Sequence, residues 1–229
     1  MERVGKMQSN IIIMLTHHDK TVKNAIDLFE ECKDLPVQYW GFKDVGLDER
    51  SMRQLVQMMK DEGKKTCIEI VTYTEHECLN GAKLAVECGF DYLMGTLYFE
   101  SVHNYLEGFD IEFLPFCGKV CGSPSVLEGT FSEIIEDAKS MISKGIKGFD
   151  LLAYRHANGE KLAEEFCREI PVPVVIAGSI NSLARLSKMS SINPWAFTMG
   201  SALFDKDFAQ DRTFRENLEA VIASMSKLE

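Results

Sequence analysis

Eight short apolar runs recur along this chain of 229 residues, and a stretch of helical periodicity follows each of them. Such an alternation is typical of parallel strands, because consecutive parallel strands need a long crossover connection. The predicted strands are Ile11–Thr16, Gln38–Lys43, Cys67–Tyr73, Tyr92–Tyr98, Phe113–Cys117, Phe149–Arg155, Val172–Gly178 and Ala196–Gly200. The pattern therefore predicts a parallel sheet covered by helices.

The segments between these strands carry apolar residues at the i, i+3, i+4, i+7 spacing of a helix that faces a core. The clearest stripes are Val22/Ala25/Ile26/Phe29, Met52/Leu55/Val56/Met59, Ile134/Ile135/Ala138/Ile142 and Phe214/Leu218/Val221/Met225. Thr130 and Glu133 form the sequence of a capping box at the start of one helix. Glycines stand where helices should end, at Gly63, Gly89 and Gly145.

Two architectures satisfy this pattern, a (β/α)8 barrel and a doubly wound open sheet. Eight units is the number that closes a barrel, and no GxGxxG sequence follows the first strand. No linker or shift of composition divides the chain. We therefore predict one (β/α)8 TIM barrel domain that spans residues 1–229.

Composition narrows the classes of partner. The net charge of −10, with scattered cations, disfavours nucleic acid, which normally requires a basic surface. The chain lacks a run of about 18 apolar residues, so no membrane span is expected. The N-terminal segment MERVGKMQSN leads into an apolar run, IIIML, too short for a secretion signal. A cytoplasmic location is the resulting expectation.

Seven cysteines are present, an odd number, and they form no CxxC pair. Most lie in apolar periodic segments, where cysteine behaves as a small hydrophobic residue. No histidine cluster accompanies them at zinc-site spacing. We predict reduced thiols, no metal site and no organic cofactor.

Two predicted strands end in the same way. The seventh runs into AGSIN (Ala177–Asn181) and the eighth into MGSALF (Met199–Phe204), so each passes through Gly-Ser into a helix. Glycine allows close approach to the backbone, and the N–H groups at a helix start favour an anion. In barrels, the loops after strands seven and eight often bind phosphate. A phosphate site is therefore predicted at these two turns, although turn chemistry alone also explains such sequences.

The segments VVIAGSIN and FTMGSALF resemble the closing motif of the ribulose-phosphate-binding barrel superfamily. The stretch AKLAVECGFDYLMGTLY (Ala82–Tyr98) is similar to the helix–strand segment of N-acetylmannosamine-6-phosphate epimerases. The resemblance implies phosphate contacts at Gly178, Ser179, Gly200 and Ser201. The chain departs from the epimerase pattern at Ala177, where that pattern has glutamate. It departs from keto-deoxy-phosphogluconate aldolases because its sixth strand, FDLLAYRH, lacks lysine.

Catalytic side chains in a barrel project from the C-terminal ends of strands. The polar residues at or near those ends are His17, His18, Asp19, Lys43, Asp44, Glu69, Tyr73, Lys119, Arg155 and His156. Lys43 follows the apolar stretch YWGF; it could form a Schiff base if its pKa is lowered, or stay cationic and hold an enolate oxygen. Glu69 interrupts CIEIV and requires a partner, for which Lys43 on the adjacent strand is available. This couple is either a source of proton transfer or a salt bridge that fixes packing.

His17 is a third candidate for acid–base catalysis. If strand geometry continues, His17 and His18 point to opposite sides, so at most one faces the pocket. Asp19 is expected to cap the next helix. Arg155 and His156 are predicted to bind the substrate, with arginine suited to a carboxylate.

These observations predict an enzyme that acts on a small phosphorylated sugar or keto acid. The predicted chemistry is that of an aldolase/lyase or an isomerase, through an enol or Schiff-base intermediate. The alternative is a non-catalytic barrel that binds a phosphometabolite and has a regulatory role. The long segment Gly118–Gly129 after the fifth strand is a candidate lid. A homodimer is expected from base rates alone.

Overall fold

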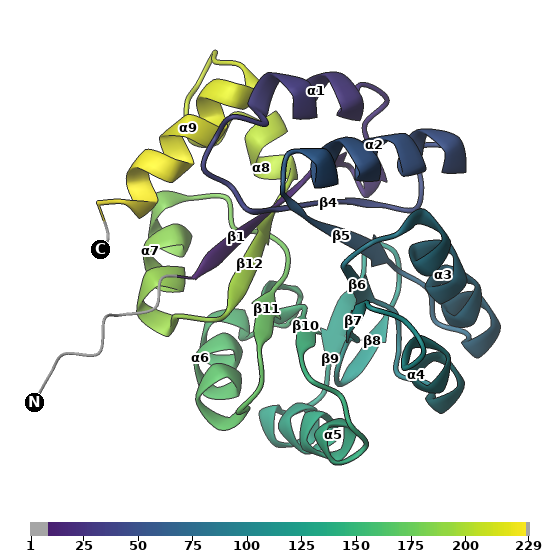
Figure 1. Cartoon of the computed structure of the whole chain (residues 1–229). Coiled ribbons are helices and arrows are strands. Elements are labelled where there is room, and N and C mark those ends of the chain that lie inside the picture. Colours follow the sequence, from purple (N-terminus) through teal and green to yellow (C-terminus); the bar gives the residue numbers. More distant parts are fainter. Residues whose placement is uncertain (1–8, 228–229) are drawn as a thin grey trace, which may run out of the picture.

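The computed structural model describes residues 9–227, and eight parallel strands form its centre (Figure 1). Their order is β10-β11-β12-β1-β4-β5-β6-β7. The backbone N–H of Asp150 in β10 donates to the carbonyl of Pro115, just after β7, at 3.1 Å, which brings the two ends of the sheet together. The strands span β1 Asn10–Met14, β4 Tyr39–Lys43, β5 Lys65–Ile70, β6 Tyr92–Gly95, β7 Glu112–Leu114, β10 Phe149–Leu151, β11 Val174–Ile176 and β12 Ala196–Met199.

Helices surround the strands as an outer ring (Figure 1). They are α1 Ala25–Cys32, α2 Glu49–Asp61, α3 Glu75–Cys88, α4 Glu100–Leu106, α5 Phe131–Ser143, α6 Gly159–Glu169, α7 Leu183–Ile192, α8 Ser201–Phe204 and α9 Phe214–Met225. The capping box predicted at Thr130 and Glu133 is present, and Gly89 ends α3 in the left-handed conformation. The predicted (β/α)8 barrel is confirmed.

The period of two along each strand separates two cores. Residues that point outward, such as Phe42, Ile68 and Leu151, pack against the helices. Residues that point inward fill the barrel as a smaller apolar cluster; its buried members are Ile12, Met14, Cys67, Met94, Leu114, Val175 and Ala196. Residues that alternate with the outward set, Lys43, Glu69 and Asp150, must therefore point into the barrel.

Several strands end earlier than predicted. β5 ends at Ile70 rather than Tyr73, and β10 ends at Leu151 rather than Arg155. After β10 the chain turns into a short 3-10 helix, η1, at Ala153–Arg155. Apolar residues beyond these strands, such as Val71 and Leu152, still pack against the core. Hydrophobicity alone cannot distinguish such residues from a continuation of the strand.

Two small hairpins lie on the C-terminal face of the barrel. The first pairs β2 Thr16–His17 with β3 Lys20–Thr21, and the second pairs β8 Lys119–Cys121 with β9 Val126–Glu128. The second hairpin occupies the segment Gly118–Gly129, whose opening and closing stays a prediction. Both hairpins place side chains beside the open end of the barrel.

The limits predicted for the domain, residues 1 and 229, lie outside the described residues. Within residues 9–227, none of the helices combines the length and the apolar character that a membrane crossing requires. All seven cysteines are free thiols, and five of them are buried, as a hydrophobic role for cysteine predicts.

Candidate active site

A polar pocket of about 210 Å³ opens at the C-terminal ends of the strands. We call it the mouth pocket. It is lined by Met14, Thr16, Asp19, Lys43, Glu69, Ser125, Leu152, Arg155, Ala177, Gly178, Ser179, Ile180, Asn181, Thr198, Met199, Gly200, Ser201, Ala202, Asp205 and Asp207. Its size is below the range of about 300–1,000 Å³ typical of drug-sized ligands, so it suits a small metabolite.

Lys43 is the last residue of β4, and its side chain is only 11% exposed. Thr21 of the β2–β3 hairpin fixes its backbone: the Thr21 hydroxyl donates to the Lys43 carbonyl at 2.7 Å and accepts from the Lys43 N–H at 2.9 Å. Gly46 allows this approach, because a Cβ at that position would lie 2.2 Å from the Thr21 carbonyl oxygen. These two hydrogen bonds join the hairpin to the end of β4 that carries Lys43.

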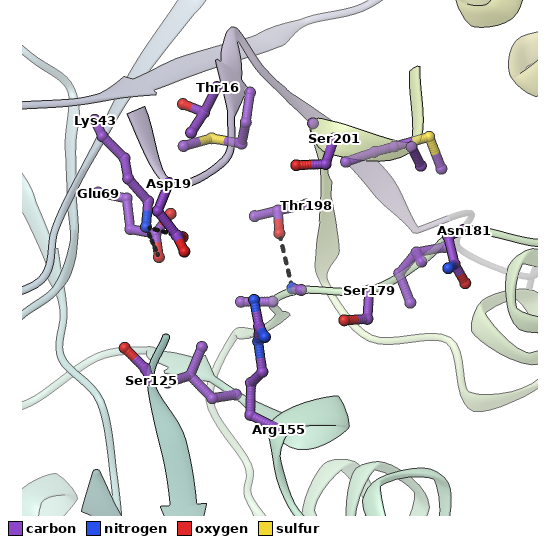
Figure 2. Close-up of a pocket in the computed structure, with 18 of the residues that line it drawn as sticks. Thr16, Asp19, Lys43, Glu69, Ser125, Arg155, Ser179, Asn181, Thr198 and Ser201 are labelled. Carbon is purple, nitrogen blue, oxygen red and sulfur yellow. Dashed lines mark hydrogen bonds and ion pairs between the residues drawn. The ribbon is translucent and has the colours of Figure 1, made fainter. Parts of the chain in front are cut away.

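Two carboxylates surround the Lys43 ammonium group (Figure 2). Its Nζ lies 2.9 Å from Oδ1 of Asp19 and 3.7 Å from Oε1 of Glu69. Lys43 and Glu69 are direct partners in the register of β4 and β5, which places both side chains at the same level of the barrel. The partner predicted for Glu69 is therefore present.

Burial and the neighbouring charges shift the pKa values of Lys43, Glu69 and Asp19 in different ways. Burial opposes the charged form of Lys43, but Glu69 and Asp19 outweigh burial and raise the pKa of Lys43 above its ordinary value. Burial raises the pKa of Glu69, and the positive charge of Lys43 offsets this only in part. Burial also acts to raise the pKa of Asp19, yet the hydrogen bond from Lys43 brings that pKa below its ordinary value. These shifts favour the cationic form of Lys43 and make the carboxylate of Glu69 more basic than that of an exposed glutamate.

A third carboxyl group, Asp150, lies deeper in the barrel. Its side chain is completely buried, and neither oxygen forms a hydrogen bond of normal geometry within residues 9–227. Burial and the nearby charge of Glu69 raise the pKa of Asp150 well above its ordinary value, while Lys43 and the Gly95 amide oppose them. These surroundings favour the neutral acid form of Asp150 more strongly than solvent would.

The two Gly-Ser turns lie side by side, since β11 and β12 are hydrogen-bonded neighbours. Gly200 passes close to β1: a Cβ there would lie 2.9 Å from the Thr16 carbonyl oxygen and 3.0 Å from that of Met14. Gly178 has φ +81°, a conformation that favours glycine. The N–H of Gly178 donates to the Thr198 hydroxyl at 3.2 Å (Figure 2), so Thr198 fixes the turn and this amide already has an acceptor.

Ser179 adopts φ +62°, which is uncommon for a residue with a side chain. Arg185 of α7 stabilises this conformation by donating to the carbonyl of Ser179 and to Oδ1 of Asn181, the latter at 3.1 Å. The same guanidinium stacks over the ring of Tyr154, 4.7 Å from its centroid. Arg185, which does not line the pocket, therefore stabilises the first Gly-Ser turn.

Arg155 enters the pocket from η1, immediately after β10. Its Nε would lie 3.6 Å from a Cβ at Gly178, so the guanidinium reaches the first Gly-Ser turn (Figure 2). Asp19 and Glu69 are within electrostatic range of it. The structure thus places a cation between the two turns and the Lys43 group.

His17 does not line the pocket. Its Nε2 lies 2.9 Å from Oδ1 of Asp205, which does line it. The expectation that His17 and His18 point to opposite sides is wrong: β1 ends at Met14, and the two rings stack with centroids 3.8 Å apart. The chain reverses at His18 and Asp19, both at positive φ, so strand alternation does not apply.

Asp19 does not cap a helix, contrary to prediction, because the hairpin turns it toward Lys43; the N-cap position of α1 is Asn24. His156 also lies outside the pocket lining. Its Nε2 is 3.0 Å from the carbonyl oxygen of Gly129, and its Nδ1 accepts from the N–H of Asn158 at 3.0 Å. Lys119 is exposed and pairs with Glu128 at 2.7 Å.

Among the contributors that escaped the sequence analysis are Thr21, Asp150, Arg185, Ser125, Thr198 and Asp205. Only Asp150 carries a signal in the sequence, because an aspartate inside the apolar run GFDLLA resembles the case of Glu69. The others act through the tertiary arrangement of loops. Within the described part of the chain, no group of three or more His, Cys, Asp or Glu side chains is arranged to hold a metal ion.

Comparisons with known proteins bear on the fold. No family model matches the chain, and no curated protein matches its sequence. The native KDPGal structure superimposes with a TM-score of 0.70 at 11% identity, covering 100% of this chain and 97% of that one. Orotidine 5'-phosphate decarboxylase from Pyrococcus horikoshii OT3 gives 0.69 at 12% identity, covering 94% and 99%.

A third solved structure is (S)-3-O-geranylgeranylglyceryl phosphate synthase from Thermoplasma acidophilum in complex with sn-glycerol-1-phosphate. Its TM-score is 0.63 at 12% identity, and the match covers 96% of this chain and 94% of that one. At such identity the likeness shows the fold, a parallel eight-stranded barrel of the type to which the ribulose-phosphate-binding barrels belong.

Proposed function

We propose that the protein is an enzyme that moves a proton next to the carbonyl group of a small phosphorylated sugar or keto acid, as an isomerase or a lyase. The observation that carries this proposal is one pocket that holds both the Lys43–Glu69 couple and the two Gly-Ser turns. An anchor for an anion and an acid–base pair on opposite sides of one small pocket are the two parts that such chemistry needs.

In this proposal the phosphate binds at the turns Gly178–Ser179 and Gly200–Ser201. Free N–H groups at the start of a helix favour an anion, and the Ser201 amide begins α8. Arg155 supplies the positive charge, which the pocket needs because Asp205 and Asp207 add negative charge to the same lining. The Gly178 amide is the weakest of the predicted contacts, since it already donates to Thr198.

Glu69 removes the proton and Lys43 stabilises the oxygen that becomes negative. A base with a raised pKa is better matched to proton abstraction near neutral pH than an ordinary carboxylate. The raised pKa of Lys43 favours a cation that donates to an enolate oxygen over a neutral amine that attacks a carbonyl. The enol route is therefore preferred to the Schiff-base route, and His17 is proposed to act indirectly, by holding Asp205 at the pocket rim.

The solved structures add support of a general kind. The names of two of them, orotidine 5'-phosphate decarboxylase and geranylgeranylglyceryl phosphate synthase, include a phosphate, and the second holds sn-glycerol-1-phosphate. A phosphorylated ligand for this barrel agrees with those names. His156 as a substrate contact, the homodimer and the cytoplasmic location stay predictions.

The test is exchange of substrate hydrogen with deuterated water. Phosphorylated ketoses, aldoses and keto acids are incubated with the protein, and deuterium incorporation next to the carbonyl is followed by NMR. Exchange that is lost in Glu69→Gln and competed by inorganic phosphate supports the proposal. Strong thermal stabilisation by a phosphorylated ligand, without exchange or turnover of any compound, would instead establish the non-catalytic binding protein.

A further inference from the structure

Ser125 brings a hydroxyl group to the mouth pocket from the tip of the β8–β9 hairpin. Figure 2 shows Ser125 and Ser179 on opposite sides of Arg155. Ser125 is half-buried, and its Oγ lies 2.8 Å from the phenol oxygen of Tyr73, which follows β5. The hairpin tip is thereby tied to the strand that carries Glu69.

The direction of this hydrogen bond follows from its neighbours. The Tyr73 phenol also lies 2.8 Å from the carbonyl oxygen of Gly122, and a carbonyl oxygen can only accept. Tyrosine has a single phenolic hydrogen, so Tyr73 uses it on Gly122. The contact between Tyr73 and Ser125 therefore requires Ser125 to be the donor.

A serine hydroxyl has one hydrogen and two lone pairs. With its hydrogen committed to Tyr73, Ser125 presents lone pairs to a ligand. It repels the oxygens of a phosphate or a carboxylate and accepts from a ligand hydroxyl. The carboxylates of Asp19 and Glu69, which line the same pocket, are acceptors as well, whereas the Arg155 guanidinium offers donors alone.

The structure assigns Ser125 a role in specificity, with Tyr73 as its positioning residue: the pair selects a ligand that carries a hydroxyl group at the end remote from its phosphate. The substrate class is then a phosphorylated polyhydroxy ketone rather than a phosphorylated keto acid. The assignment rests on the proposed function for the location of the phosphate at the Gly-Ser turns.

The experiment measures binding by calorimetry for three probes: inorganic phosphate, a ketopentose 5-phosphate and its 1-deoxy analogue. The two sugars differ by one hydroxyl group at the end away from the phosphate. The wild-type protein is expected to prefer the hydroxylated sugar by roughly tenfold, because the analogue leaves an acceptor unsatisfied. In Ser125→Ala the preference falls to within about threefold, while the affinity for inorganic phosphate is unchanged.

Tyr73→Phe provides the second variant, because it releases the Ser125 hydrogen and lets this hydroxyl donate. The preference should fall there too, although Ser125 is retained. Ser123→Ala, an exposed serine of the same hairpin that does not line the pocket, is the matched control and keeps the wild-type preference.

Equal affinities of the two sugars in the wild-type protein, no binding of either, or a preference that survives in Ser125→Ala would overturn the assignment. Sugar binding that inorganic phosphate cannot compete would instead count against the phosphate anchor of the proposed function. That second failure leaves the hydroxyl preference measurable, so the two outcomes are distinct.

Discussion

The two sides of the mouth pocket are built from different parts of the chain. The side formed by Gly178–Ser179 and Gly200–Ser201 consists of backbone at tight turns, where a Cβ or a change of φ would alter the shape. The opposite side consists of ionisable side chains, Lys43 and Glu69, whose backbone belongs to regular strands. In the proposed function, the first side binds an anion through its backbone geometry, and the second carries out proton transfer through its charged side chains.

This difference separates the effects that substitutions should have. A change of a side chain at the Lys43–Glu69 side should reduce the chemical step and leave anchoring intact. A change of backbone shape at the Gly-Ser side should weaken anchoring and leave the chemical step nearly intact. Four expected outcomes follow, from the largest effect to the smallest. The first three test whether the two sides are separable in this way, and the fourth concerns the buried acid Asp150.

Glu69→Gln should have the largest effect, because the amide cannot accept a proton. We expect the proton exchange rate to fall by about 10²–10⁴-fold, with the affinity for inorganic phosphate unchanged. In the wild-type protein, activity should be lost as pH falls through the raised pKa of Glu69, thus at a higher pH than for an ordinary glutamate near pH 4.5. A measured pH–rate profile whose acid limb lies at or below that value would contradict the assignment.

Lys43→Met removes the cation and should lower the exchange rate by roughly 10²–10³-fold, the usual cost of losing a donor to a developing oxyanion. It also leaves Asp19 and Glu69 without their shared counter-ion, so the free energy of unfolding should fall. Lys65→Met is the matched control, because Lys65 pairs with Asp91 at 3.1 Å at the far end of the adjacent strand β5. Comparable losses of activity in both variants would show that charge removal alone, not position, is responsible.

Gly200→Ala should act on anchoring. The added Cβ would lie 2.9 Å from a backbone oxygen of Thr16, so the turn must shift. We expect affinity for inorganic phosphate to fall by roughly tenfold, about 1.4 kcal/mol, with KM raised and kcat changed little. Gly108→Ala, where the nearest atom to the new Cβ is 3.9 Å away, serves as the control. A loss confined to kcat would contradict the prediction that the Gly-Ser side affects binding and not the chemical step.

Asp150→Asn should change stability more than activity. A carboxyl whose folded pKa is raised holds its proton in the folded state, while the unfolded chain releases it above about pH 4. Its contribution to the stability of the folded state therefore falls as pH rises from that point, until the folded pKa is reached. The asparagine variant lacks this dependence. As pH rises, its free energy of unfolding should therefore increase relative to that of the wild type, by up to about 1.4 kcal/mol per pH unit.

Urea unfolding at several pH values between about 4 and 8 measures this difference, with exposed Asp211→Asn as the control. Parallel curves for Asp150→Asn and the wild type would mean that Asp150 is ionised in the folded protein. A gain with pH would show that the barrel retains a buried acid at a cost in stability, as functional sites often do.

The amount that could be predicted differs from residue to residue for physical reasons. Lys43 and Glu69 could be paired in advance, because both lie in the regular part of adjacent parallel strands, where register and alternation hold. Asp150 obeys the same alternation and could have been found by the same reasoning. His17 and Asp19 could not, because alternation fails where the chain reverses at positive φ.

The sequence by itself determined the barrel, the position of the two Gly-Ser turns at the ends of β11 and β12, and the pairing of Glu69 with Lys43 on the adjacent strand. All three depend on hydrophobic periodicity or on local backbone preference, which neighbouring residues specify. Only the tertiary structure decided that Asp19 completes the Lys43 group, that Arg185 holds the Ser179 turn, and that Tyr73 fixes the Ser125 hydrogen. These contacts join residues on different elements through loops, and the direction of a loop depends on the packing of the whole barrel.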